Sequence, residues 1–262
     1  MARRKMQKGI CRLCKKTTEL SFEHIPPKVA FNKFTKYRSI PFIEYVQNSR
    51  NPDYKPSGKL MQGGLGEYCL CRDCNSFLGN IYVPSYYRMA LIGRNILQNY
   101  NVDKIHFKTT DLSPLRLLKQ VLAMFICINK PEFTTSFPEL LPFVRNPKEQ
   151  FLPNRYRVYM YLNKIGKTRN LSMMYTNHHG LLCELTFPPL GFVLSIDNPN
   201  SIPSLTEITQ FKNINLDFNG EIYFEMNVLP THLPYVADYR TEEEIEETIR
   251  KSEEFIASKK TY

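Results

Sequence analysis

Two pairs of cysteines in the N-terminal third of this 262-residue chain have a spacing that suits metal binding. Cys11 and Cys14 form one C-x2-C pair, and Cys71 and Cys74 form the other. This spacing lets a tight turn place two thiolates about 2.3 Å from one zinc ion, and two such turns complete a tetrahedron. In a segment with little core of its own, the metal contributes folding energy directly. The four cysteines therefore predict a structural Zn²⁺ site.

The remaining cysteines leave one alternative open. Cys69 precedes the second pair in the stretch CLCRDC, so three cysteines compete for two ligand positions. We favour Cys71 and Cys74, because a two-residue gap closes such a turn more readily than a one-residue gap. Cys127 and Cys183 lie in apolar stretches, where a thiol behaves as a small hydrophobic side chain, and they are expected in the core.

A carboxylate, an imidazole and an amide could form a second centre. Glu23 and His24 are adjacent in the stretch SFEHIPPKVA, and Asn75 directly follows the last of the paired cysteines. If that pair leads into a helix, zinc would hold the start of the helix against the segment that leaves the first pair. On a strand, Glu23 and His24 would point to opposite faces unless the backbone bends, and the two prolines that follow favour such a bend.

These residue types suit the hydrolysis of a phosphodiester bond. The oxygens of Glu23 and Asn75 are hard ligands of the kind that Mg²⁺ or Mn²⁺ prefers. A neutral imidazole at His24 can take a proton from water near neutral pH, and a metal beside it would stabilise charge on the phosphate and the leaving oxygen. The alternative is structural: His24 caps a turn and Glu23 is a surface charge.

In their order along the chain, these motifs resemble those of the HNH, or ββα-metal, endonuclease superfamily. The resemblance rests on CRLC, EHIPP and GGLGEYCLCRDCNSFLGN, within roughly residues 8 to 90. It is closest to the zinc-bearing branch of which phage recombination endonuclease VII is typical. The resemblance implies that His24 is the general base, that Glu23 and Asn75 bind the catalytic Mg²⁺ or Mn²⁺, and that the four paired cysteines bind the structural zinc.

The chain departs from the pattern of that family at three places. Glu23 stands where Asp is commoner, and Pro26 stands where the endonuclease VII branch has a second histidine. Residues 31–66 form a longer insert than the compact family core needs. The middle asparagine of the motif is therefore Asn48, Asn51 or absent.

Positive charge is concentrated at the start of the chain. The net charge is +10, and residues 1–60 hold 14 Lys and Arg against 4 Asp and Glu, whereas the rest holds 21 of each. This surplus suits a polyanion, because Lys and Arg release counterions when they contact phosphates; a basic surface that only aids solubility is the alternative. We expect the chain to bind DNA, or RNA, through residues that include Lys28, Lys33, Arg38 and Arg72.

The composition favours a globular protein of the cytoplasm. Hydrophobic residues make up 42% of the chain and charged residues 23%, and no stretch approaches the roughly 20 apolar residues that span a bilayer. The basic start MARRKMQKGICRLCKK has no apolar stretch behind it, so we do not expect a secretory signal. The interpretation is a cytoplasmic protein with no membrane partner, in which cysteines stay reduced.

The patterns along the chain predict an α+β fold in two parts. Residues 1–95 are expected to form an HNH-like nuclease domain, a zinc-stapled ββα-metal module of treble-clef type. Residues 96–262 are expected to form an α+β domain whose role is targeting, regulation or oligomerisation. Helical apolar spacing covers residues 84–100 and 112–130, and five alternating apolar segments between residues 157 and 229 predict an antiparallel sheet.

Two local signals refine this interpretation. The stretch TNHHGLL predicts a hairpin turn with Gly180 in the left-handed region, so His178 and His179 are expected in the turn. Thr241 and Glu244 have the spacing of a capping box at the start of a terminal amphipathic helix.

The combined prediction is a metal-dependent HNH endonuclease that hydrolyses DNA phosphodiester bonds. A nuclease head on a separate domain of balanced charge suits a restriction or anti-phage effector. A homodimer is one expected form, because cutting both strands of a duplex often needs two active sites. The alternative is a non-catalytic, zinc-stabilised nucleic-acid-binding module.

Overall fold

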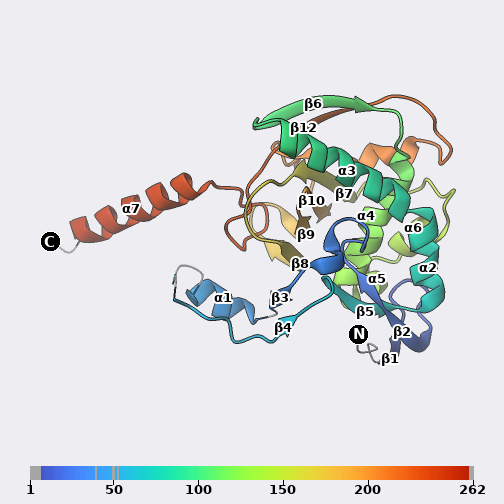
Figure 1. Ribbon diagram of the computed structural model, residues 1–262, viewed down its shortest axis with the longest axis horizontal. Coiled ribbons are helices and arrows are strands. Elements are labelled where there is room, and N and C mark those ends of the chain that lie inside the picture. The colour runs from blue at the N-terminus through green and yellow to red at the C-terminus, as the bar shows by residue number, and fades with distance from the viewer. Residues whose placement is uncertain (1–6, 39, 49–50, 52, 260–262) are drawn as a thin grey trace.

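Three antiparallel strands and a helix form the N-terminal part of the computed structural model, which describes residues 7–38, 40–48, 51 and 53–259 (Figure 1). β2 (Thr17–His24) lies between β1 (Gln7–Ile10) and β5 (Gly66–Leu70), and α2 (Arg72–Ile81) follows β5 after one residue. β1 and β5 both run antiparallel to β2, so their last residues and the start of β2 lie at the same end of the sheet. Both cysteine pairs therefore lie at this end of the sheet.

The long segment between β2 and β5 forms an insert that lies beside the body of the molecule (Figure 1). Its elements are η1 (Asn32–Phe34), β3 (Tyr37–Arg38), α1 (Phe42–Asn48) and β4 (Leu60–Met61). β3 and β4 pair antiparallel, so the chain leaves the three-stranded sheet and returns to it through one short ribbon.

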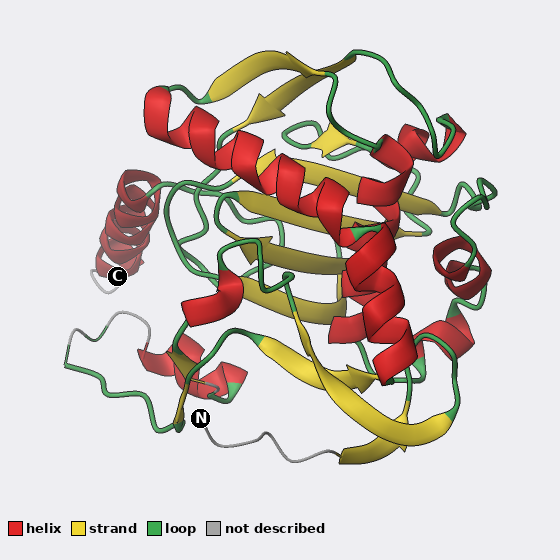
Figure 2. Ribbon diagram, turned by 45° about the vertical axis from the view of Figure 1, so that its right-hand side comes forward, coloured by secondary structure: helices red, strands yellow, loops and turns green. Residues whose placement is uncertain are grey.

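Helix α4 (Pro114–Ile128) lies at the centre of the molecule. Every one of its residues except Arg116 is buried. A helix that is apolar on all sides has to be surrounded by other elements, and α3 (Val83–Asn99) lies along it. Figure 2 shows the helices crossing one face of the main sheet. Both helices match the predicted ones to within two residues at each end, and the short α5 (Phe133–Ser136) and α6 (Leu140–Arg145) follow.

The main sheet is antiparallel throughout, with the strand order β11-β7-β10-β9-β8. The strands are β7 (Tyr156–Leu162), β8 (Arg169–Thr176), β9 (Gly180–Phe187), β10 (Leu190–Ile196) and β11 (Thr206–Glu207), and η2 (Thr209–Asn213) follows β11. Four of the five predicted segments are confirmed as strands of this sheet. The predicted hairpin turn is also confirmed, because Gly180 has a φ of 64° and His178 and His179 lie in the turn before it.

The fifth predicted segment lies outside the main sheet. It forms β12 (Ile222–Asn227), which pairs with β6 (Lys104–Thr109) in a separate ribbon beside α3 (Figure 1). Alternate residues of β6 face inward, and the ring of Phe107 stacks on that of Phe224 with 5.0 Å between centroids. The expectation of one five-segment sheet was wrong at this strand.

One hydrophobic core extends through both predicted parts of the chain. The hydroxyl of Tyr82 donates to the carbonyl of Val144 at 2.7 Å, and the ring of Tyr86 lies 5.8 Å from that of Phe192. All four residues are buried. A boundary between residues 95 and 96 would fall inside α3, and the two-domain division stays a prediction.

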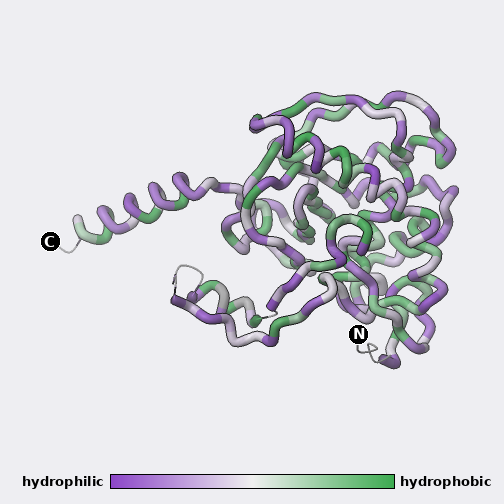
Figure 3. The backbone as a smooth tube through the Cα atoms, in the orientation of Figure 1, coloured by the Kyte–Doolittle hydropathy of each residue, from purple (hydrophilic) through white to green (hydrophobic). Residues whose placement is uncertain are grey.

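Helix α7 (Glu242–Lys259) projects from the body of the molecule (Figure 1). Its predicted capping box is confirmed: the Glu244 amide donates to Thr241 Oγ1 at 3.2 Å, and the Thr241 amide donates to Glu244 Oε2 at 2.8 Å. Only Ile245 of this helix is buried, and Figure 3 shows hydrophilic and hydrophobic residues alternating along it. Among the described helices, none combines the length and apolar character needed to cross a membrane.

Candidate functional site

The four paired cysteines meet in one cluster. The Sγ atoms of Cys11, Cys14, Cys71 and Cys74 all lie within 4.8 Å of one another, and those of Cys14 and Cys71 are 3.8 Å apart. The first pair lies in a tight turn, in which Lys15 takes a left-handed backbone with a φ of 64°. The second pair begins α2, where Cys71 is the N-cap.

This cluster could hold a zinc ion. Sulfurs bound at about 2.3 Å in a tetrahedron lie about 3.8 Å apart, which is the distance between the Sγ atoms of Cys14 and Cys71, and the other sulfurs lie within 4.8 Å of one another. Crowding also makes the thiols compete for protons: the hydrogen bond with Cys74 lowers the pKa of Cys11 to about 4, and the same bond raises the pKa of Cys74. A dication is the group that would let all four sulfurs ionise together.

The structure decides between the candidate cysteines. Cys69 is fully buried and its side chain interacts with that of Cys127 rather than with the cluster. Cys71, the N-cap of α2, and Cys74, in the first turn of α2, supply the second pair, as predicted. Cys127 and Cys183 are buried in the core, which confirms the structural role expected of them.

Arg12 connects the cysteine cluster to the rest of the molecule. It lies between the two cysteines of the first pair and forms an ion pair of 2.8 Å with Glu67 on β5. It also donates to the carbonyl of Cys127 near the end of α4. The first cysteine turn is therefore attached both to the neighbouring strand and to the central helix.

Glu23 is a buried carboxylate near the end of β2. Its side chain is 7% exposed, and burial raises its pKa to about 8. Within the part of the chain that the structure describes, no hydrogen-bond donor or cation contacts this carboxylate. A buried, charged carboxylate without a partner is costly, so the protonated form of Glu23 is favoured.

His24 is half-buried at the last position of β2. Its Nε2 lies 3.0 Å from the carbonyl oxygen of Gly63, and its ring meets that of Phe22 edge-on with 5.1 Å between centroids. Gly64 lies against the ring, because a Cβ at that position would come within 2.7 Å of the His24 Cδ2. The two glycines of the returning insert thus hold the imidazole in place.

Asn75 reaches β2 from the first turn of α2. Its Nδ2 donates to Ser21 Oγ at 3.1 Å and to the Phe22 carbonyl at 3.3 Å. The structure therefore places the Asn75 amide beside the strand residues that immediately precede Glu23 and His24. Glu23 and His24 themselves differ in burial, as expected for neighbours on a strand.

Asn32 is a residue of this site that the sequence reasoning missed. It is fully buried, its Nδ2 donates to the carbonyls of Pro26 and Leu65 at 2.6 and 2.8 Å, and its Oδ1 accepts from the Leu65 amide at 2.8 Å. It therefore joins the segment that leaves β2 to the segment that enters β5. The two residues predicted as the middle asparagine of the motif have other contacts. Asn48 donates to the Glu44 carbonyl within α1, and the Asn51 side-chain oxygen accepts from the Asp53 amide in a turn.

The four predicted nucleic-acid contacts are all exposed. Lys28 and Lys33 lie in the segment after His24, where the Lys33 ammonium sits 4.9 Å from the ring centroid of Phe34. Arg38 belongs to β3 and donates to the Gly58 carbonyl at 2.6 Å. Arg72 is the first residue of α2, beside the cysteine cluster.

Comparison with known proteins adds no relative. No family model matches the chain, and no curated protein or solved structure matches it. The chemistry of the site has to be inferred from the geometry at the end of β2 and the start of α2.

Proposed function

We propose that the protein is a metal-dependent endonuclease of the HNH type that hydrolyses DNA phosphodiester bonds. The observation that carries the proposal is the bonding of Asn75 to Ser21 and Phe22, because it joins the start of α2 to β2 directly beside Glu23 and His24. A cysteine knuckle, an antiparallel strand pair and a helix in this order support the treble-clef-like, ββα-metal interpretation of the N-terminal module.

His24 is the general base in this proposal. Since a carbonyl oxygen can only accept, the contact with Gly63 means that a neutral imidazole carries its proton on Nε2. The basic lone pair then lies on Nδ1, which can take a proton from a water molecule. The hydroxide formed in this way is the nucleophile that attacks the phosphorus.

Glu23 and Asn75 would hold the catalytic Mg²⁺ or Mn²⁺. A carboxylate and an amide oxygen are the ligands such ions prefer, and the unpartnered, buried state of Glu23 fits this role. The bound ion would stabilise negative charge on the phosphate and on the leaving oxygen. Asn75 donates to β2 through its Nδ2. Its side-chain oxygen is the atom that would bind the ion.

The zinc site would be structural. Its four ligands come from the turn before β2 and the first turn of α2. A zinc ion there would fix α2 relative to β2, and so would hold Asn75 at the correct place relative to the strand.

DNA is the expected substrate because the charge surplus of the chain lies in its first 60 residues, where 14 basic residues face 4 acidic ones. Lys28 and Lys33 follow the proposed base, and Arg38 and Arg72 lie on the neighbouring elements. We assign these residues to phosphate contacts. A role as a restriction or anti-phage effector fits a nuclease module joined to a large additional body.

The proposal is tested with purified full-length protein and the variant His24→Ala. Wild type should cut or nick DNA with Mg²⁺ or Mn²⁺, whereas the variant should lose cleavage and keep its zinc content and circular dichroism spectrum. Branched, duplex and single-stranded DNA, together with RNA, identify the preferred form. Equal cleavage by wild type and variant, in samples free of other nucleases, would rule the assignment out.

A second candidate function is a non-catalytic, zinc-stabilised nucleic-acid-binding module. The burial of Glu23 favours it, because a carboxyl with a pKa raised to about 8 stays protonated at neutral pH when no cation is bound. This function predicts salt-sensitive binding of nucleic acid without turnover in either divalent ion.

A further inference from the structure

The C-terminal helix carries an apolar stripe that is buried at Ile245, near the start of the helix, and exposed toward its C-terminal end. Ile245, Ile249 and Ile256 lie on one face of α7 at helical spacing, with Phe255 beside them. Ile256 is 55% exposed and Phe255 is 59% exposed. Most helical stability in proteins comes from the packing of an apolar face, and within the described residues α7 buries only Ile245.

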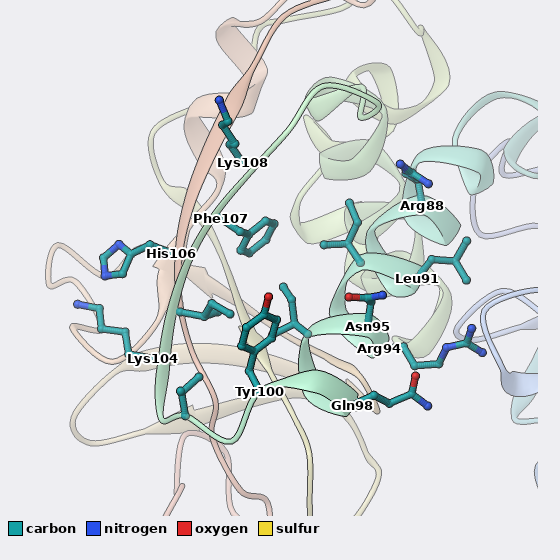
Figure 4. A pocket seen from close by; sticks show the side chains of 14 residues that line it. Arg88, Leu91, Arg94, Asn95, Gln98, Tyr100, Lys104, His106, Phe107 and Lys108 are labelled. Carbon is teal, nitrogen blue, oxygen red and sulfur yellow. The ribbon is translucent and has the colours of Figure 1, made fainter.

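A groove on the body has the complementary character. It lies between α3 and β6, has a volume of about 710 Å³, and is floored by apolar side chains that include Ile92, Ile105 and Phe107. Figure 4 shows Phe107 and Tyr100 pointing into the space between the helix and the strand. Tyr100 is 55% exposed and Val102 is 42% exposed, so apolar surface remains open here.

The rim of the groove is basic. Its basic lining residues are Arg88, Arg94, Lys104, His106 and Lys108, and none of the described residues that line it is acidic. Figure 4 shows His106 and Lys104 pointing to the outer side of β6 and Arg94 lying on the far side of α3. Three of these cations pair with acids of the same chain, but both partners are exposed. Such surface pairs contribute little and can exchange partners.

The charge of α7 is opposite to that of the rim. The helix carries seven glutamates against Arg250, Lys251 and Lys259, a net charge of 3 − 7 = −4. Glu246 and Glu253 flank the apolar stripe on one side and have no ion pair within the described chain. An apolar stripe with an acidic flank is the ligand that an apolar groove with basic edges would accept.

We propose that α7 of one copy docks in the α3–β6 groove of a second copy, and that the exchange is reciprocal. The start of α7 lies next to the groove, because Glu242 and Glu243 share a hollow with Val102 and Asp103. The helix nevertheless runs away from the groove of its own body (Figure 1). A second copy related by a two-fold axis would fill both grooves with both helices. This inference goes beyond the proposed nuclease function and does not depend on it.

The contact is tested with full-length protein that carries the photo-crosslinker p-benzoylphenylalanine at position 255. Isotope-labelled and unlabelled chains are mixed before irradiation, and the linked peptides are identified by mass spectrometry. Links to residues 88–108 that join a labelled to an unlabelled chain are the expected result. The same crosslinker at position 254, on the opposite side of the helix, should give few such links. Links only within one chain, only between two α7 helices, or none above that control would overturn the proposal.

A second measurement uses the charges. Phe255→Asp should raise the dimer dissociation constant roughly tenfold or more, as the loss of an apolar anchor does at interfaces. Lys104→Glu with Lys108→Glu, and separately Glu246→Lys with Glu253→Lys, should each weaken self-association in light scattering. Mixing the two charge-reversed proteins should restore dimers, and melting curves check that both stay folded. Dimers unchanged by reversal at the rim, with DNA binding weakened instead, would assign the rim to nucleic acid and overturn the docking.

Discussion

Because the pKa of Glu23 is raised in the folded protein, this one carboxyl makes the free energy of unfolding depend on pH. The carboxyl has an ordinary value of 4.5, and burial raises it to about 8 in the folded chain. Below the lower value, both states are protonated and the folded state keeps its full stability. As the pH rises from 4.5 toward 8, the unfolded chain gains from ionising while the folded chain does not, so the free energy of unfolding falls by about 1.4 kcal/mol per pH unit.

At about pH 9, we expect Glu23→Gln to unfold at a higher urea concentration than wild type, with a free energy of unfolding that is larger by on the order of 3 to 5 kcal/mol. Near pH 4, below the ordinary pKa of the carboxyl, the two proteins should match. Both proteins are measured with zinc present and without Mg²⁺. If Glu23 is a ligand as we propose, adding Mg²⁺ at high pH should then stabilise wild type alone, because glutamine lacks the carboxylate that would bind the ion. A variant that shows the same pH response as wild type would contradict the burial of an unpaired carboxyl.

Substitution of Asn32, an uncharged residue, should lower the free energy of unfolding strongly. Asn32→Ala removes three hydrogen bonds. It leaves the Leu65 amide and the Pro26 carbonyl without these partners, whereas the Leu65 carbonyl still accepts from the Ile25 amide, so we expect a loss of about 2 to 4 kcal/mol of unfolding free energy. Asn48→Ala is the matched control, because its one bond lies within a short surface helix and its loss should cost under about 1 kcal/mol. Urea denaturation of both variants makes the comparison, and equal effects would contradict it.

Some residues of the site can be predicted from the sequence, and others cannot. The spacing of Cys71 and Cys74 encodes a turn that can be recognised in one dimension, and the structure confirms the cluster. Asn32 has no such signal, since its importance arises from the approach of Leu65, 33 positions away. The burial of Asn32 depends on tertiary structure, so the sequence around it does not predict it.

At the scale of elements, zinc should join the strands to α2. We expect one zinc per chain by elemental analysis, and we expect Cys74→Ser to lose it, with broadening of the NMR signals of α2. Cys69→Ser is the control, because Cys69 lies outside the cluster and that variant should keep its zinc. Zinc loss from Cys69→Ser with retention in Cys74→Ser would reverse the ligand assignment.

Helices were predictable to the extent that they are strongly periodic. The strongly apolar α4 and the capping box of α7 are local patterns, and both are confirmed. The pairing of β12 with β6 was not predictable, because the partners are separated by more than a hundred residues and an alternating strand fits any sheet with an apolar face. The strands β3 and β4 have two residues each, which is too short for an alternating pattern that could be recognised in the sequence.

For the whole molecule, the continuous core predicts cooperative unfolding. Tyr82 and Tyr86 belong to the segment before residue 95, yet they contact Val144 and Phe192 beyond it. With zinc bound, urea unfolding followed by tyrosine fluorescence and by far-ultraviolet circular dichroism should therefore give one coincident transition. Two separate transitions would instead support independent domains divided near residue 95.

Through Arg12, a zinc ion held by the four cysteines would affect more of the protein than its own ligands. Since this side chain leaves the first cysteine turn and ends at Glu67 and the Cys127 carbonyl, a turn released by metal loss would withdraw its guanidinium from the last turn of the central helix. Demetallation would then expose backbone at the middle of the protein as well as at its edge. In a cell short of zinc, proteases would meet a loosened whole chain, and the abundance of the protein would follow the supply of the metal.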